Sequence, residues 1–291
     1  MVEQNKPMIG KVCMVTGATG GIGKVTAQAL AQQGATVTVV GRSRAKTVAT
    51  VEQITRQTGN PSVEYLLADL SVQDEIRRLA EEFRSRHDRL HVLVNNAGAF
   101  FMSRHESADG IEMTFALNHL GYFLLTNLLL DVITASAPAR IINVSSVAHD
   151  GAQINFDDLQ EKQKFQGWQA YGQSKLANVL FTYELARRLE GTGVTANALH
   201  PGFVATSFGA NNFGFIGRGV KRVMNLVAGI SPEKGAETNI YLATSPEVEG
   251  VTAQYFVKKK AVRSSEASYD EEAARRLWEV SAEMAGLPVQ V

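Results

Sequence analysis

The sequence has little cysteine and no excess charge, and each shortage excludes classes of protein. A single cysteine, Cys13, among 291 residues excludes an intramolecular disulfide and a zinc site built from cysteines. The 29 lysines and arginines are balanced by 29 aspartates and glutamates, so no net field attracts nucleic acid. The first ten residues hold no apolar run of signal-peptide or membrane-spanning length. We therefore expect a soluble, cytoplasmic protein without a membrane anchor.

The hydrophobic residues alternate between short apolar runs and longer segments with helical spacing. Seven runs are predicted to be strands, at 11–16, 37–40, 63–67, 91–95, 139–145, 194–199 and 254–257. Helices are expected at 24–33, at 71–86 behind a Ser71–Asp74 capping box, at 109–135, at 168–189, from Ser231 onward, and at 270–286. This order predicts an α/β fold: a single Rossmann-type domain over 1–291, with a doubly wound parallel sheet of about seven strands and helices on both faces.

A glycine-rich turn joins the first predicted strand to the first helix. Gly17, Gly21 and Gly23 let the backbone approach a ligand closely, and the N-terminus of the helix favours an anion. A P-loop is excluded, because aligning it on Gly23-Lys24 puts alanine at its first glycine and valine at its Mg²⁺-binding hydroxyl. A dinucleotide loop fits better, although its glycines fall as Gly-x-x-x-Gly-x-Gly. From this motif alone, a turn without a ligand stays open.

The end of the second strand indicates which dinucleotide is preferred. An acid about 20 residues past the glycines would bind the ribose 2′-hydroxyl of NAD. No Asp or Glu occurs between Lys24 and Val51, and the strand ends in Gly41-Arg42-Ser43-Arg44. The guanidinium of Arg42 suits a 2′-phosphate, which predicts NADP(H). The alternative is that both arginines are solvated charges at a helix start.

Tyr171 and Lys175 stand four residues apart, on one face of a predicted helix. Lowering a tyrosine pKa from about 10 to about 7 requires roughly 4 kcal/mol. One cation at about 4 Å, in an effective dielectric near 20, supplies about that much. The pair can therefore act as an acid–base group at neutral pH, unless it is an ordinary surface pair. Ser145-Ser146 at a strand end, and Asn118 inside an apolar helix, favour the active-site interpretation.

Taken together, these segments resemble the classical short-chain dehydrogenase/reductase family over nearly the whole chain. The motifs that carry the resemblance are 16–23, Asp69-Leu70, 95–98, Asn118, Ser145-Ser146, Tyr171-x-x-x-Lys175 and Pro201-Gly202-x-Val204-x-Thr206. The segments 118–123, 231–256 and 276–281 resemble the retinol dehydrogenase-like branch of that family.

The resemblance implies a role for each matching residue. Ser146 would bind the substrate oxygen, and Tyr171 would exchange a proton with it. Lys175 would lower the pKa of that tyrosine and hold the nicotinamide ribose, and Asn118 would anchor a water that links Lys175 to solvent. The implied cofactor-binding residues are Gly17, Thr19, Gly20, Gly21, Ile22, Gly23, Asp69, Leu70, Asn95, Ala97, Gly98, Tyr171, Lys175, Pro201, Gly202, Val204 and Thr206.

The segment 203–230 is rich in phenylalanine and glycine. This composition fits a mobile lid over an apolar substrate, or a packed surface loop or oligomer contact. Phe100, Phe101 and Met102 could extend the same wall. We therefore expect a lipophilic aldehyde, ketone or alcohol as the substrate. The outer faces of the helices at 109–135 and 168–189 could pair copies into a homodimer or homotetramer.

Other polar residues receive structural interpretations. The six histidines lack ligand spacing, so no metal site is expected, and His119 and His200 are assigned structural roles. The preferred function is NADP(H)-dependent interconversion of a carbonyl and an alcohol. One alternative is a non-enzymatic NADP(H)-binding regulator on the same fold. The other is a specialised reductase of a carbon–carbon double bond.

Overall fold

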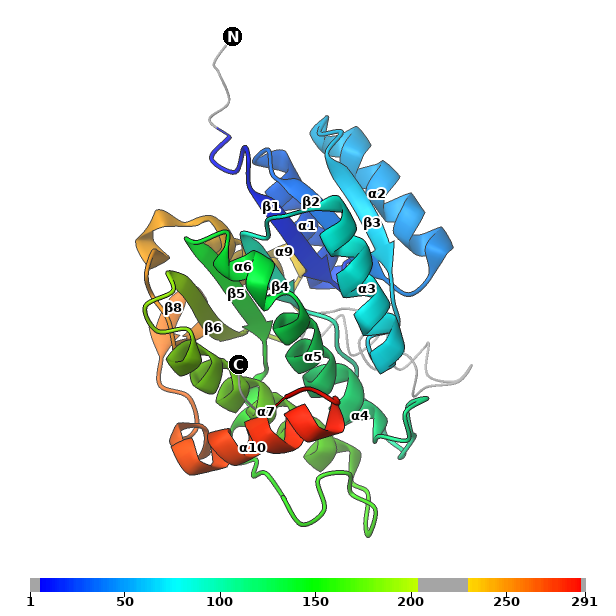
Figure 1. Cartoon of the computed structure of the whole chain (residues 1–291), viewed down its shortest axis with the longest axis vertical. Coiled ribbons are helices and arrows are strands. Elements are labelled where there is room, and N and C mark those ends of the chain that lie inside the picture. Colours follow the sequence, from blue (N-terminus) through cyan, green and yellow to red (C-terminus); the bar gives the residue numbers. More distant parts are fainter. Residues whose placement is uncertain (1–5, 204–229, 289–291) are drawn as a thin grey trace.

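The computed structural model describes residues 6–203 and 230–288, and an eight-stranded sheet forms its centre (Figure 1). The strand order is β3-β2-β1-β4-β5-β6-β7-β8, and β1 to β7 run parallel. The strands are β1 (Val12–Thr16), β2 (Thr36–Gly41), β3 (Val63–Leu67), β4 (Val92–Asn95), β5 (Ala139–Val144), β6 (Val194–His200), β7 (Tyr255–Val257) and β8 (Lys260–Val262). The order reverses between β1 and β4, where sheets of this kind bind ligands at the carboxyl ends of their strands.

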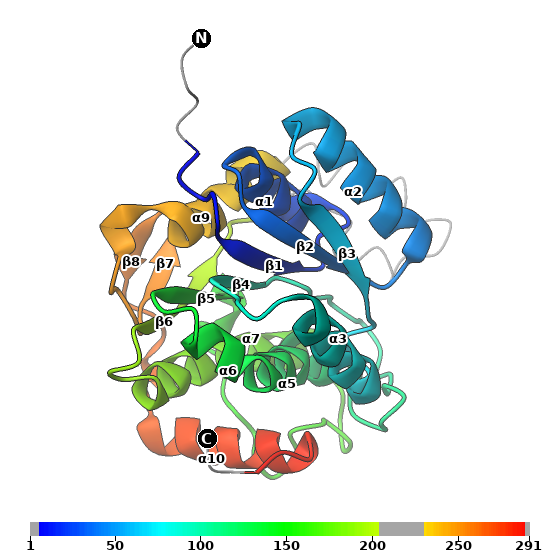
Figure 2. The same ribbon diagram turned by 45° about the horizontal axis from the view of Figure 1, so that its top comes forward.

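Helices cover both faces of the sheet, as predicted (Figure 2). One face carries α1 (Gly21–Gln32), α2 (Arg44–Thr58) and α9 (Pro232–Thr244). The other carries α3 (Gln73–Arg86), α5 (Gly121–Leu128), α6 (Leu130–Thr134) and α7 (Gly167–Arg188), with α10 (Glu271–Met284) outside α7. The remaining described helices are short: α4 (Met113–Phe115), η1 (Ala116–Leu120), η2 (Val147–His149), η4 (Pro246–Val248) and η5 (Glu266–Tyr269). The α/β, doubly wound prediction is therefore confirmed.

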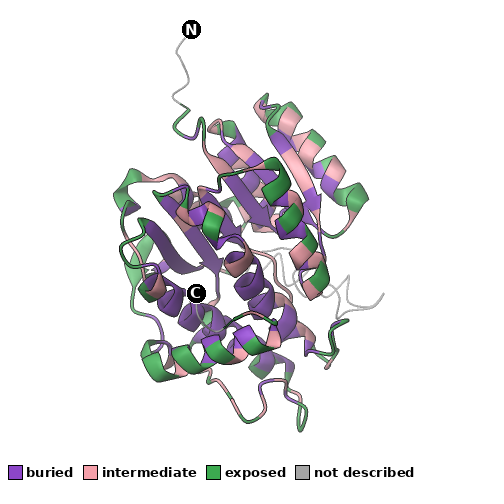
Figure 3. Cartoon of the chain, viewed as in Figure 1, coloured by how far each residue is buried: buried purple, intermediate pink, exposed green. Residues whose placement is uncertain are grey.

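The central strands are buried on both faces, as Figure 3 shows. Cys13 in β1 is fully buried, and burial raises the pKa of its thiol to about 12. It therefore acts as a small apolar side chain.

The helix predicted at 109–135 is observed from Met113 to Thr134, but it starts later than predicted and is irregular. Glu112 ends a turn and its carboxylate accepts hydrogen bonds from the N–H groups of Thr114 and Phe115, so the helix begins at Met113. A π-helical stretch, η1, then precedes α5, and α6 follows after Leu129. Within η1, the main-chain carbonyl of Asn118 accepts a hydrogen bond from Asn178 Nδ2 at 2.9 Å. A side chain of another helix thus supports the irregular turn.

The capping box predicted at Ser71 is wrong. The hydroxyl of Ser71 donates to Asp69 Oδ1 at 2.7 Å, and α3 begins at Gln73. The N–H of Gln73 donates instead to Asp109 Oδ2 at 2.9 Å. The acceptor comes from a distant segment, which no local pattern indicates. By contrast, Ser231 caps α9 as predicted, accepting from the N–H of Lys234.

The seven-strand prediction missed β8, which pairs antiparallel with β7. Lys258 and Lys259 form the turn between them with φ of 49° and 64°. Strand β8 is three residues long and exposed, so it has no apolar alternation that a sequence pattern could detect.

The outer face of α7, expected to be open to a second copy, is covered by α10 (Figure 1). Leu277 belongs to one buried apolar cluster with Leu176 and Leu180, and the ring of Trp278 lies 5.8 Å from that of Phe181. The chain therefore covers this part of the helix with its own C-terminal segment. None of the helices between residues 6 and 203 or between 230 and 288 has the length and apolar character to cross a bilayer.

Candidate active site

The glycine turn and the end of β4 interlock at the point where the strand order reverses. Gly17 has φ of 63°, and a Cβ there would lie 2.8 Å from Ala97 Cα. Asn96 joins the two loops: its N–H donates to Thr16 Oγ1, and its Nδ2 donates to the carbonyl of Thr16, both at 2.8 Å. Asn96 was not among the predicted site residues, since only its cross-strand contacts reveal its role.

The start of α1 fits the pyrophosphate of a dinucleotide. Its N-cap, Gly20, supplies no side-chain cap, and the first turn holds no acidic residue. A Cβ on Gly23 would approach Asn96 Nδ2 to 2.4 Å and the carbonyl of Gly17 to 2.8 Å. Close backbone packing thus presents the first N–H groups of a twelve-residue helix, which favours a bound anion. Thr19, Gly21 and Ile22, also predicted here, lie in the same turn.

Arg42 extends from the end of β2 and is exposed. Its Nη1 lies 3.6 Å from Asp69 Oδ2. The sequence between Lys24 and Val51 contains no acidic residue, but the carboxylate of Asp69 reaches Arg42 from the loop after β3. On the other side, a Cβ on Gly41 would meet Thr19 Cγ2 at 2.4 Å. The predicted 2′-phosphate residue therefore adjoins the glycine loop.

Two of the predicted cofactor residues direct their side chains into the protein. Asn95 is fully buried, and its Nδ2 donates to Thr126 Oγ1 at 3.0 Å and to Asn143 Oδ1 at 2.9 Å. The side chain of Leu70 belongs to the apolar core beneath α3 and α5. Contact of either residue with a cofactor would have to come from its main chain.

Ser146 and Tyr171 lie together beyond the carboxyl end of β5. The Ser146 side chain is near enough to lower the pKa of the Tyr171 hydroxyl, and Ser146 Oγ accepts from the N–H of Ala148 at 3.2 Å. Ser145 is buried and donates to the carbonyl of Lys175 at 2.7 Å. The second serine of the pair thus faces the tyrosine, whereas the first ties β5 to α7.

Lys175 and Asn118 complete the group of four. The Nζ of Lys175 donates to the carbonyl of Val144 at 3.1 Å and lies 5.7 Å from the ring centre of Tyr171. The amide of Asn118 accepts from the N–H of Ala99 at 2.9 Å and donates to its carbonyl at 3.0 Å. A Cβ on Gly98 would lie 3.2 Å from Asn118 Oδ1 and 3.5 Å from Lys175 Nζ. Residues from the loop after β4, from η1 and from α7 therefore meet at one point.

The protein alone does not lower the pKa of Tyr171, contrary to the prediction. Burial raises this pKa to about 12, while the hydrogen bond from Ser146 lowers it. Burial also lowers the pKa of Lys175 to about 7. A fully charged Lys175 at about 4 Å would lower the pKa of Tyr171. Here burial disfavours the charged form of Lys175, and its Nζ donates to the carbonyl of Val144.

An apolar surface borders Tyr171. The ring of Phe100 lies edge-on to Tyr171 at 5.8 Å and to Trp168 at 6.0 Å. Trp168, Met102 and Phe203 are exposed, by 64%, 59% and 68%. Phe101 turns instead toward His105. Of the three exposed side chains, Trp168 lies next to Tyr171, with ring centres 6.0 Å apart, and Phe203 lies against His200, with ring centres 5.8 Å apart.

The end of β6 leads toward the predicted lid. Pro201 and Gly202 follow the strand, and Gly202 has φ of 92° and packs near Ile230. Val204, Thr206 and most of the predicted lid (204–229) lie outside the described residues.

His119 and His200, which were assigned structural roles, both make hydrogen bonds within the fold. His119 is fully buried, with Nε2 2.8 Å from Ser281 Oγ. His200 accepts from the N–H of Val147 at 3.3 Å. Within the described part of the chain, no three His, Cys, Asp or Glu side chains could hold a metal ion.

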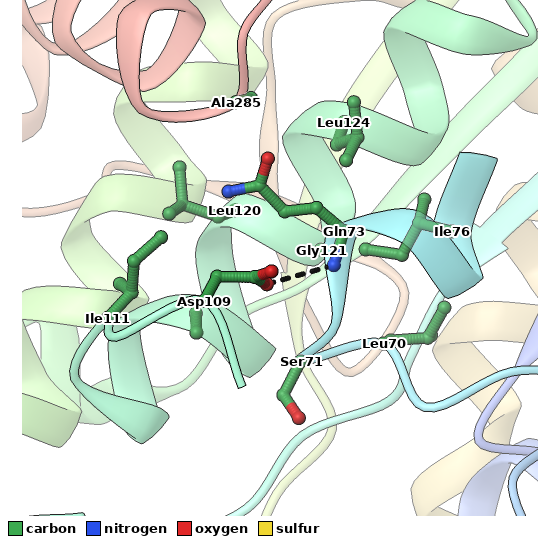
Figure 4. Close-up of a pocket in the computed structure, with 11 residues that line it drawn as sticks. Leu70, Ser71, Gln73, Ile76, Asp109, Ile111, Leu120, Gly121, Leu124 and Ala285 are labelled. Carbon is green, nitrogen blue, oxygen red and sulfur yellow. Dashed lines mark hydrogen bonds between the residues drawn. The ribbon is translucent and has the colours of Figure 1, made fainter. Parts of the chain in front are cut away.

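A small pocket lies away from Tyr171, between α3, the η1–α5 segment and the end of α10 (Figure 4). Its volume of about 10 Å³ accommodates about one water molecule. Figure 4 also shows the bond from the N–H of Gln73 to Asp109. The pocket is too small for a cofactor or a substrate, so the strand-end site remains the candidate.

Comparison with known proteins gives relatives that match almost the whole chain. Human retinol dehydrogenase 14 is 44% identical, and the match covers 96% of this chain and 88% of that protein. Human polyprenol dehydrogenase is 41% identical over 97% of this chain and 87% of its own length. Mouse retinol dehydrogenase 12 is also 41% identical.

Solved structures share the fold. A crystal structure of a protein from Mycobacterium paratuberculosis superposes with a TM-score of 0.78 at 30% identity, covering 98% of this chain and 97% of that one. The complex of Pseudomonas aeruginosa RhlG with NADP in its active site has a TM-score of 0.69 at 27% identity, covering 88% and 97%. The model of the short chain dehydrogenase family matches residues 11–214. The chain therefore belongs to the short-chain dehydrogenase family, and within it resembles the retinol dehydrogenases.

Proposed function

We propose that this short-chain dehydrogenase interconverts the carbonyl and alcohol forms of a lipophilic substrate with NADP(H). One observation carries the proposal: Tyr171 and Lys175 of α7 lie together, with Nζ 5.7 Å from the tyrosine ring centre, and Ser146 acts on the Tyr171 hydroxyl, at the carboxyl ends of strands that also hold the glycine loop. Family membership implies a nicotinamide cofactor, and the uncapped start of α1 suits its pyrophosphate.

When bound, the nicotinamide supplies hydride to the carbonyl carbon or accepts it from the alcohol. Ser146 and Tyr171 hold the substrate oxygen through their hydroxyl groups, and Tyr171 donates its proton to that oxygen in reduction. The raised pKa of Tyr171 keeps the hydroxyl protonated at neutral pH, which suits it to donate. Lys175, when protonated, stabilises the tyrosinate that remains.

Arg42 supports NADP(H) over NAD(H). Its guanidinium has five donors, so it can bind a 2′-phosphate while paired with Asp69. The RhlG structure, which contains NADP, gives a further reason to test this cofactor first.

The apolar surface around Tyr171 supports a lipophilic substrate. The rings of Phe100 and Trp168 lie within 6.0 Å of the Tyr171 ring, and Trp168 is 64% exposed. The names of the relatives refer to retinol and polyprenol, both lipophilic isoprenoid alcohols. We infer that this chain accepts substrates of that class.

The test is reduction of all-trans-retinal and of a polyprenal with NADPH and with NADH. Tyr171→Phe should lower the turnover about 10²–10⁴-fold, because it removes the proton donor. Fluorescence titration should show unchanged NADPH binding. Tyr241→Phe, in α9, is the matched control and should keep full activity.

Two outcomes would overturn the proposal. Full activity in Tyr171→Phe would exclude this tyrosine as the acid. Tight NADPH binding without reduction of any carbonyl would favour the non-enzymatic regulator.

A further inference from the structure

His149 is a buried histidine next to the active site that the proposed chemistry does not use. His149 lies on η2, directly after Ser146, and is 3% exposed. Its Nδ1 is 2.7 Å from the carbonyl oxygen of Ser146. Its Nε2 is 3.0 Å from the main-chain nitrogen of Ser265, on the segment before α10.

The two partners determine where the proton sits on the ring. A carbonyl only accepts, so Nδ1 must carry the hydrogen, and a main-chain N–H only donates, so Nε2 must be bare. His149 is therefore the neutral Nδ1–H tautomer. Burial lowers the pKa of this ring, opposed by the Ser146 carbonyl and by Asp150, and this favours the neutral form.

Aromatic, imidazole and carboxylate groups surround the ring of His149. The ring of Tyr255 on β7 lies 4.6 Å from that of His149. His200 on β6 is close enough that a charge on His149 lowers the pKa of His200. Asp150 follows on the same turn. A positive charge on His149 would keep the bond to Ser146 but lose the bond from Ser265.

Contacts on η2 fix both the carbonyl and the hydroxyl of Ser146. The carbonyl accepts from the main-chain N–H of His149 and from its ring, and Oγ accepts from the N–H of Ala148. With an acceptor site of Oγ occupied in this way, its proton points away from η2. The carbonyl of Ala148 also faces Gly172, the neighbour of Tyr171, where a Cβ would come within 2.9 Å.

The other end of the bridge is anchored to the helix that carries Tyr171. Ser264 Oγ lies 2.7 Å from the hydroxyl of Tyr183 on α7 and 2.6 Å from Ser268 Oγ. The N–H of Ser265 therefore belongs to a segment that is held against α7.

We propose that His149 is a positioning residue: its neutral ring bridges Ser146 to the segment at Ser265 and so sets the Ser146 hydroxyl against Tyr171. The proposal rests on the proposed function, because it assigns His149 to the same site. It assigns no contact with substrate or cofactor to the ring.

The tautomer is tested without any substrate. Protein labelled with ¹⁵N-histidine gives long-range ¹H–¹⁵N spectra that distinguish the two neutral tautomers and the charged ring. The signal missing from His149→Gln identifies His149. We expect the Nδ1–H form at about pH 7.5. An Nε2–H or a charged ring at that pH would overturn the proposal.

A pair of variants separates the two hydrogen bonds. The amide of His149→Asn can place a donor near the Nδ1 position and keep the bond to Ser146. The longer His149→Gln can place an acceptor near the Nε2 position and keep only the bond from Ser265. His149→Phe keeps the ring shape but neither bond.

Turnover is then measured with NADPH and all-trans-retinal. His149→Gln and His149→Phe should lose about 10–100-fold in kcat with unchanged NADPH affinity, whereas His149→Asn should retain most of it. The pH profile for retinol oxidation should shift to higher pH in His149→Gln and His149→Phe but not in His149→Asn, because the Ser146 side chain, when held in place, lowers the pKa of Tyr171.

If His149→Gln is more active than His149→Asn, the ring serves only to hold the C-terminal segment, and the proposal fails. If the wild type reduces no carbonyl with either cofactor, the proposed function fails, and the tautomer measurement alone decides this inference.

Discussion

Lys175 carries an amine that burial makes difficult to charge. Its pKa falls from the ordinary 10.5 to about 7. The unfolded chain keeps the ordinary value, so between these two values the unfolded state binds more protons than the folded state. The free energy of unfolding therefore rises with pH in that range.

We expect the stability of the cofactor-free protein to rise between about pH 7 and pH 9, with a slope approaching about 1.4 kcal/mol per pH unit. Urea unfolding at a series of pH values measures this slope. Lys175→Met should show a smaller slope, because it removes the titrating amine. At higher pH the raised pKa values of Cys13 and Tyr171 act in the opposite sense. Equal slopes in the two proteins would contradict the assignment.

Arg42 gives a second prediction at the level of a single residue. Replacing it with glutamine should weaken NADPH binding about 10–100-fold and change NADH binding little, because a charge-assisted bond to the 2′-phosphate contributes about 1.5–3 kcal/mol. Arg44→Gln is the matched control, since Arg44 is also exposed and bonds only weakly to Tyr65. An equal loss of affinity for NADPH and NADH would show that Arg42 does not bind the 2′-phosphate.

Single residues were predictable where the chemistry requires a fixed spacing. Tyr171 and Lys175 stand one helical turn apart, so the sequence itself places them together. Asn96 and His149 act through main-chain groups far away along the chain, and no spacing reveals such contacts. The carboxylate beside Arg42 escaped prediction for the same reason.

At the level of elements, α7 must approach η2 closely to bring Tyr171 to Ser146. Gly172 permits this approach, because a Cβ there would lie 2.9 Å from the carbonyl of Ala148. Gly172→Ala should destabilise the protein by about 1–3 kcal/mol, although alanine ordinarily favours a helix. It should also lower kcat. Gln169→Ala, at an exposed position of α7, should leave both unchanged.

Urea unfolding and retinal reduction measure the two effects of Gly172→Ala. A more stable variant with full activity would show that η2 moves aside at no cost.

Elements were predictable where one strand or helix is uniform in character. The apolar parallel strands and the long helix at 168–189 were found within a few residues. At 109–135 the helix was predicted, but its later start and its π-helical stretch were not, because they depend on Glu112 as a cap and on Asn178 from another helix. Neither contact can be predicted from the spacing of apolar residues.

The whole molecule depends on α10 to cover α7. Trp278 is buried against Phe123 at 5.0 Å, and the guanidinium of Arg188 lies 4.2 Å from its ring. Trp278→Ala should cost about 3–5 kcal/mol and expose the apolar face of α7. Trp168→Ala is the control, since Trp168 is mostly exposed and should affect retinal turnover but not stability.

Urea unfolding and sedimentation velocity test this prediction. We expect a monomeric wild type, and self-association in Trp278→Ala. A wild-type dimer that survives Trp278→Ala would place the contact between copies on another surface.

The overall architecture was predictable because each βα unit repeats the same pattern. The covering of α7 was not, since the helix at 270–286 was predicted without any indication of its neighbour. The pattern of an amphipathic helix predicts that one face packs against an apolar partner, but it does not identify that partner.

Because α9 packs on α1, the fold of α1 is completed only after α9 has been synthesised. Asn239 of α9 donates to Thr26 of α1 across 213 residues of chain. At about 5–20 residues per second, a ribosome needs roughly 10–40 s to make that length. Throughout this delay the glycine loop is already synthesised, but the side of α1 that α9 covers is bare. A translation arrest before α9 would therefore release a chain whose glycine loop is complete but whose α1 is uncovered, and we expect chaperones to bind the exposed side of this helix.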